Sequence, residues 1–193
     1  MGTARARGQR AGLTRDAVLA AARDQIAEHG LAAMTMRAIA ARLGVAPNAL
    51  YHHAPGKEAL VDDLLDRVLE PVRPPWPPPA DPAARVEALL VATYDALLAA
   101  PDLVPLFLTR RRRSGPHADR LTAETLTAIG EAGRTGADAT EALRALIVYT
   151  FGFAAVAGRP TADPGGSAPL PAERLRENYV HGLRWLLTGA LGR

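Results

Sequence analysis

Residues 30–60 read GLAAMTMRAIAARLGVAPNALYHHAPGKEAL, and this stretch decides the fold. Apolar side chains in its first half recur every three or four residues, as on one face of a helix. Thr35 can cap the start of that helix, and Gly44 can end it in a left-handed conformation. Pro47 suits the first turn of a second short helix, which Leu50 can anchor to the core. Two short helices joined by so tight a turn predict a helix-turn-helix.

The outward face of the second helix carries side chains that suit a DNA groove. Asn48 can pair with a base edge, because its amide offers both a donor and an acceptor. Tyr51, His53 and Lys57 can reach phosphates, and the first turn of the supporting helix adds backbone N–H groups that favour a phosphate. The predicted DNA-binding residues are Thr35, Met36, Arg37, Pro47, Asn48, Ala49, Tyr51, His52, His53 and Lys57.

The pattern closely resembles the helix-turn-helix signature of the TetR family of bacterial repressors. The shared elements are a Gly-Leu opening, Thr-x-Arg-x-Ile-Ala, Leu-Gly-Val, Leu-Tyr-x-His and a lysine four residues after that histidine. Two positions depart from the family: Ala46 stands where Ser is common, and Ala54 where Phe is common. His52 stands at a position that varies within the family, which makes it a candidate for operator specificity.

The resemblance implies the architecture of the whole chain. TetR-like proteins are all-α homodimers, in which a three-helix DNA-binding domain is joined by a fourth helix to a ligand-binding domain. The last two long helices, here near residues 137–157 and 172–191, pair with their copies in a four-helix bundle. The implied function is a transcriptional regulator, most often a repressor, that a small-molecule effector releases from a palindromic double-stranded DNA operator. The C-terminal part looks most like the tetracycline-repressor branch.

Helical spacing continues to the C-terminus and predicts about nine helices and almost no strand. The first helix is expected to begin at the cap Thr14 and to end at Gly30, and the second helix of the motif to end near Ala54. Seven of the twelve residues from 71 to 82 are proline, which favours an extended, stiff spacer, or alternatively a ligand for a proline-reading domain. The expected parts are a basic tail (1–13), the helix-turn-helix domain (14–56), a connecting helix (57–70), the spacer (71–82) and a ligand-binding and dimerisation domain (83–193).

The basic side chains gather at the N-terminus. Residues 1–57 hold eight basic and three acidic side chains, residues 58–73 are net acidic, and the rest is nearly neutral. Such a local positive charge is a candidate contact for a polyanion, or a solvated tail without a partner.

The effector pocket is expected in the C-terminal helices, lined by Phe107, Arg110, His117, Leu121, Leu126, Tyr149 and Phe153. Each has a plainer reading, as a core side chain or, for His117, as an exposed residue of a first helical turn. The run from Arg110 to Arg113 can bind an anionic effector, extend the DNA contact, or simply be a solvated helix end. The scarcity of aromatic residues favours an aliphatic pocket and an apolar or amphipathic ligand.

Composition excludes several classes of protein. The 193 residues contain no cysteine, which excludes disulfides, zinc–cysteine sites, iron–sulfur clusters and thiol nucleophiles. The sequence has no Gly-rich phosphate loop, His-Glu-x-x-His or Gly-x-Ser-x-Gly motif, so we expect no enzyme, cofactor or metal site. No signal peptide or bilayer-spanning run is evident, which predicts a cytoplasmic protein without a membrane partner. The alternatives are a sequence-neutral DNA binder and a helical partner-binding protein without effector control.

Overall fold

The computed structural model describes residues 13–110, 115–158 and 171–192, and within these ranges it contains nine α-helices, one 3-10 turn and no strand. The predicted all-α fold is therefore confirmed. The chain divides into two compact units, Met1–Leu64 and Leu65–Arg193, and the boundary falls inside a helix. The tail before residue 13 and the arginines at 111–113 lie outside the described residues.

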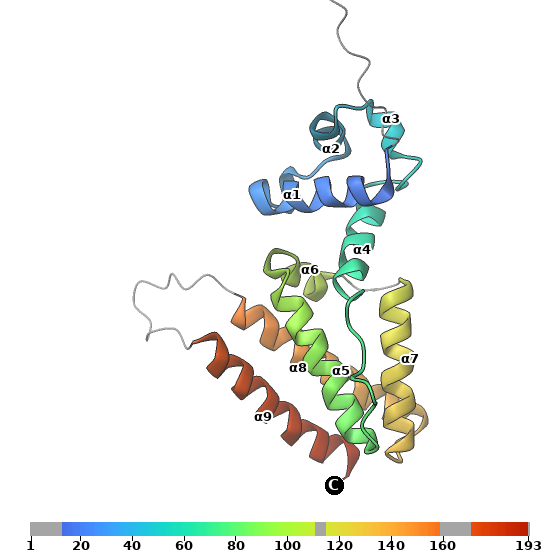
Figure 1. Cartoon of the computed structure of the whole chain (residues 1–193), viewed down its shortest axis with the longest axis vertical. Helices are drawn as coiled ribbons and strands as arrows, with labels where there is room; N and C mark the ends of the chain where they lie inside the picture. The colour runs from blue at the N-terminus through green and yellow to red at the C-terminus, as the bar shows by residue number, and fades with distance from the viewer. Residues whose placement is uncertain (1–12, 111–114, 159–170, 193) are drawn as a thin grey trace, which may run out of the picture. The chain divides into compact units, whose positions relative to one another are not determined.

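The first unit contains the helix-turn-helix. Its helices are α1 (Arg15–Ala33), α2 (Met36–Leu43), α3 (Pro47–Leu50) and the start of α4 (Lys57–Val68), labelled in Figure 1. The predicted caps are confirmed: the Thr14 hydroxyl accepts from the N–H of Ala17 at 3.1 Å, and the Thr35 hydroxyl from the N–H of Ala38 at 3.1 Å. Gly44 ends α2 with φ 66°, in the left-handed region that glycine adopts without penalty.

Two element boundaries differ from the prediction. Gly30 was expected to end the first helix, but it is a break (φ 77°, ψ 165°) followed by a further turn to Ala33. The second motif helix was expected to reach Ala54, but α3 has four residues and continues as hydrogen-bonded turns, with Leu50 O accepting from the N–H groups of His53 and Ala54. The N-cap of α3 is Ala46, which makes no side-chain cap bond, so packing and the backbone hydrogen bond from the N–H of Ala49 to Ala46 O (3.0 Å) hold its first turn.

The second unit is a bundle of α5 (Pro82–Leu98), α6 (Val104–Thr109), α7 (Pro116–Glu131), α8 (Gly136–Ala157) and α9 (Ala172–Leu191), with the 3-10 turn Pro101–Leu103 before α6. Helix α5 lies at its centre, because it packs against α7, α8 and α9 (Figure 1). The proline-rich segment is fastened to this unit at its start: Val72 is buried, and its carbonyl accepts a hydrogen bond from Arg120 Nη2 on α7 at 2.8 Å.

Four aromatic side chains tie α5, α8 and α9 together. Tyr94 and Tyr179 stack with ring centroids 4.1 Å apart, and Tyr149 and Phe153 close the cluster. The Tyr179 hydroxyl donates to Leu90 O at 3.0 Å, and burial raises its pKa far above the ordinary value. This cluster fixes how the three helices cross.

Helix α8 is long and apolar enough, by length and composition alone, to cross a bilayer. In this fold its buried face packs against α5, α6, α7 and α9. A core helix of a helical bundle has the same composition, so packing of this face explains part of the apolar character of α8.

Candidate nucleic-acid interface and ligand cavity

The turn between α2 and α3 presents a short polar helix to solvent. The backbone N–H of Gly44 donates to the carbonyls of Ala40 and Ala41, and the N–H of Val45 donates to Ala40 O at 3.0 Å. Leu50 is fully buried and fastens α3 from below, whereas Asn48, on the same helix, is exposed. The helix therefore has one anchored face and one free polar face.

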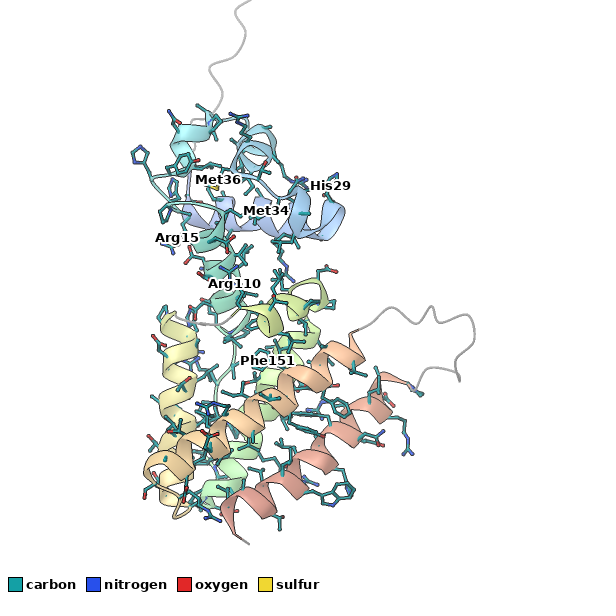
Figure 2. The ribbon with its side chains drawn as sticks, turned by 180° about the vertical axis from the view of Figure 1, so that it is seen from behind. Arg15, His29, Met34, Met36, Arg110 and Phe151 are labelled. Atoms are coloured by element: carbon teal, nitrogen blue, oxygen red, sulfur yellow. The ribbon has the colours of Figure 1, made fainter. Side chains whose placement is uncertain are left out.

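The predicted DNA-binding residues fall into two groups. Most are at least partly open to solvent, and Tyr51 is 52% exposed. Met36 instead points into the first unit and is 9% exposed, so it supports the interface from inside (Figure 2). The solvent-accessible members are Thr35, Arg37, Pro47, Asn48, Ala49, Tyr51, His52, His53 and Lys57.

Lys57 holds the motif together as well as carrying charge. Its Nζ donates to Leu31 O at 2.7 Å, in the last turn of α1, which fastens the start of α4 to α1. An ammonium group has three protons, so this bond leaves others available. The sequence alone did not indicate this second role.

The basic residues of the first unit differ in how they are paired. Arg42 binds Glu28 through two hydrogen bonds of 2.7 Å, which lowers the pKa of Glu28 and raises that of Arg42. Arg15 pairs with Asp63 at 2.6 Å. Arg37 is exposed, and no ion pair to it is found among the described residues. Arg37 is therefore the arginine of this motif best placed to meet a phosphate, while Arg42 and Arg15 brace the helices.

The second unit contains a cavity of about 220 Å³ between α5, α7 and α8, which we call the ligand cavity. Its wall is aliphatic apart from one phenylalanine and three threonines, and it includes no ionisable side chain. The lining residues are Leu69, Leu90, Thr93, Ala118, Leu121, Thr122, Thr125, Leu143, Ile147 and Phe151. Phe151 is labelled in Figure 2.

Of the seven predicted pocket residues, Leu121 lines this cavity. Phe107 is core and packs on Phe151 with centroids 4.9 Å apart, and Tyr149 and Phe153 belong to the aromatic cluster. Arg110 follows α6, and its N–H donates to Leu106 O at 3.2 Å. Leu126 is half-buried on α7, outside the lining, and His117 lies in the first turn of α7.

A buried carboxylate holds the start of α7, in a contact that we call the Asp66 clamp. Asp66, on α4, accepts hydrogen bonds from the backbone N–H groups of His117 (3.1 Å) and Ala118 (2.9 Å) and is 9% exposed. Gly115 leaves the space: a Cβ there would lie 2.3 Å from Asp66 Cγ. The clamp adjoins the ligand cavity, because Ala118 and Leu69 line it. The sequence signal is an aspartate among the leucines of α4, which is too common to interpret without the structure.

Comparison with known proteins shows which family these features belong to. Residues 18–64 match the sequence model described as bacterial regulatory proteins, tetR family. Residues 18–64 therefore form a DNA-binding region of the TetR type. All ten predicted DNA-binding residues lie inside the matched region.

Relatives and solved structures agree with this assignment. The transcriptional repressor KstR2 of Rhodococcus jostii is 34% identical over 85 residues, which are 42% of this chain and 42% of KstR2, so the match spans less than half of that relative. BioQ of Mycobacterium smegmatis is 26% identical with a TM-score of 0.76, over 93% of this chain and 99% of that one. The regulator SCO7222 of Streptomyces coelicolor is 25% identical with a TM-score of 0.74, over 93% and 98%.

Proposed function

We propose that this protein is a TetR-family repressor that binds a palindromic operator as a homodimer and leaves the DNA when a small molecule occupies the ligand cavity. The observation that carries the proposal is the free polar face of α3, with Asn48 exposed above the buried anchor Leu50. A BioQ structure 26% identical to this chain, with a TM-score of 0.70, was solved with its DNA operator, which supports a role in DNA binding. The name of KstR2 supports repression.

The residues proposed to contact DNA divide by task. Asn48 on α3 and His52 in the turn that follows it read base edges, because both are exposed and carry hydrogen-bonding groups. Arg37, Tyr51 and Lys57 hold phosphates and fix the register without reading sequence.

Exposed apolar side chains on α8 and α9 support the homodimer. Val148 and Val156 are 65% and 64% exposed and lie two turns apart on one face of α8, with Gly152 between them, where an added Cβ would meet nothing within 4 Å. On α9, Trp185 is 70% exposed. A second copy covering these faces would remove them from water, and a two-fold operator needs two recognition helices about 34 Å apart.

The DNA-binding proposal is tested by selecting sites from random duplex DNA and measuring affinity from low to physiological salt. We expect an enriched two-fold symmetric site that survives physiological salt. Asn48→Ala should change the preferred base at its contact by about 1–3 kcal/mol, whereas Arg37→Ala should weaken binding to all sequences alike. Binding that vanishes as salt rises, with no enriched site, would leave a charge effect only and refute the proposal.

The homodimer is tested by sedimentation equilibrium at micromolar concentration. The double variant Val148→Arg, Val156→Arg should be a folded monomer, and Thr140→Arg, at an exposed position near the start of α8, is the matched control and should remain a dimer. A monomeric parent protein, or a dimer unaffected by the double variant, would contradict an interface on this face of α8.

A further inference from the structure

The wall of the ligand cavity sets the charge of its occupant. All ten lining side chains are neutral, and seven of them are hydrocarbon only. An ion transferred from water into such a site loses its hydration and gains no counterion, which costs far more than transferring a neutral molecule of the same shape. The cavity therefore suits an uncharged occupant.

The buried hydroxyl groups of the wall have a fixed hydrogen-bonding direction. Thr93 Oγ1 donates to Leu89 O at 2.8 Å, and Thr125 Oγ1 donates to Leu121 O at 2.7 Å. Thr93 is 8% exposed and Thr125 is 4% exposed. A hydroxyl group has a single proton, so each of these groups meets an occupant with lone pairs alone. The inner wall accepts hydrogen bonds and does not donate them.

The third lining threonine, Thr122, differs from Thr93 and Thr125 in burial and in hydrogen bonding. Thr122 is exposed, and no hydrogen bond of its hydroxyl is found among the described residues. Thr122 therefore lies where the cavity meets solvent, and its hydroxyl can form hydrogen bonds with water. The selective groups are the two buried threonines, one on α5 and one on α7.

The volume of the ligand cavity limits the size of its occupant. A protein cavity of about 150 Å³ lined by Leu, Ile and Phe binds benzene. The ligand cavity, at about 220 Å³, is roughly half as large again and suits two fused rings or an alkylated single ring.

We propose that the ligand cavity selects a neutral, mostly hydrocarbon molecule of about this size that carries an O–H or N–H donor, such as a phenol or an alcohol. Thr93 and Thr125 receive that donor, and the uncharged wall rejects carboxylates. The proposal rests on the function proposed above, since it names the chemical class of that protein's effector.

The test uses four probes of one shape: 2-naphthol, 2-methoxynaphthalene, naphthalene and 2-naphthoate. Their affinities for the full chain are measured by calorimetry at pH 7. We expect 2-naphthol to bind roughly tenfold more tightly than 2-methoxynaphthalene, because a neutral hydrogen bond contributes that order of affinity. We expect no measurable binding of 2-naphthoate.

Two variants test whether Thr93 and Thr125 cause the preference for 2-naphthol over 2-methoxynaphthalene. In Thr93→Val and Thr125→Val the preference for 2-naphthol over 2-methoxynaphthalene should fall toward onefold, while naphthalene binding, which needs no acceptor, should persist and show that the cavity is intact. Thr127→Val is the matched control: its hydroxyl makes the same bond to the carbonyl four residues earlier, at 2.9 Å, but it is exposed and outside the lining. This control should keep the parent preference.

The outcomes separate this inference from the proposed function. Equal binding of 2-naphthol and 2-methoxynaphthalene, binding of 2-naphthoate, or failure of every probe to bind overturns the inference. Operator release is measured separately. A probe that binds with the expected selectivity and leaves the operator complex intact supports the chemistry of the cavity and counts against its effector role. Release by charged molecules alone refutes the inference and preserves the effector role.

Discussion

Removing the carboxylate of Asp66 should destabilise the second unit. The side chain accepts hydrogen bonds from two backbone N–H groups in the first turn of α7. The N–H groups of a first helical turn have no carbonyl partner within their own helix. A hydrogen bond to a charged group contributes about 1.5–3 kcal/mol, and replacing a capping side chain by alanine costs about 0.5–2 kcal/mol. Asp66 is 9% exposed, so water replaces the lost acceptor only in part. We therefore expect Asp66→Ala to lower the free energy of unfolding by about 2–4 kcal/mol.

The matched variants test the cause. Asp66→Asn keeps one acceptor oxygen and loses the charge, so it should cost about half as much. Gly115→Ala places a methyl group 2.3 Å from Asp66 Cγ and should displace the carboxylate at a similar cost to Asp66→Ala. Because Gly115 has an extended φ of 176°, that cost is steric and not conformational.

The assay is urea unfolding followed by circular dichroism, with the midpoint and slope compared between variants. Glu70→Ala is the control on the neighbouring turn: it removes a half-exposed ion pair with Arg67 at 2.9 Å and should change stability by less than about 1 kcal/mol. An Asp66→Ala variant as stable as the control would refute the claim that the clamp holds α7.

Three further outcomes are expected. Gly44→Ala should cost about 1 kcal/mol, read from the urea midpoint, because φ is 66° and no atom lies within 4 Å of the added Cβ; no change would mean that the turn relaxes. Lys57→Met should weaken binding to all DNA sequences alike and flatten the salt dependence, measured by fluorescence anisotropy; an altered base preference would show that Lys57 reads sequence. Burial raises the pKa values of Tyr94, Tyr149 and Tyr179, so their contribution to stability is complete below the unfolded pKa near 10 and is lost as pH rises above it. Tyrosinate absorbance should rise together with the loss of helical signal, and ionisation of several tyrosines before unfolding would contradict this.

Local sequence signals predicted the first unit well. The caps at Thr14 and Thr35 and the left-handed Gly44 depend on neighbouring residues only, and the structure has each of them. The length of α3 was overestimated, because the apolar spacing continues past Leu50 while the uncapped start at Ala46 gives the helix little support of its own.

The second unit shows why the cavity was harder to predict. Phe107 and Tyr149 look like pocket residues because aromatic side chains line many binding sites, but the fold places one in the core and the other in the aromatic cluster. Thr93 and Thr125 are buried on different helices, more than thirty positions apart, and their shared cavity exists only after α5 and α7 pack. The same holds for the Asp66 clamp, whose members are about fifty residues apart in sequence.

The position of the boundary between the units has a practical consequence for building hybrid proteins from this chain. It falls after Leu64, inside α4, with Lys57 and its bond to Leu31 on one side and the Asp66 clamp on the other. A crossover between Leu64 and Leu65 therefore keeps the Lys57–Leu31 bond within the first unit and the Asp66 clamp within the second. A crossover placed at the end of the same helix would separate Asp66 from Gly115. The residue that replaces Asp66 would then have to fit the space beside Gly115. Recombination of this chain with its relatives should succeed at the first junction and fail at the second.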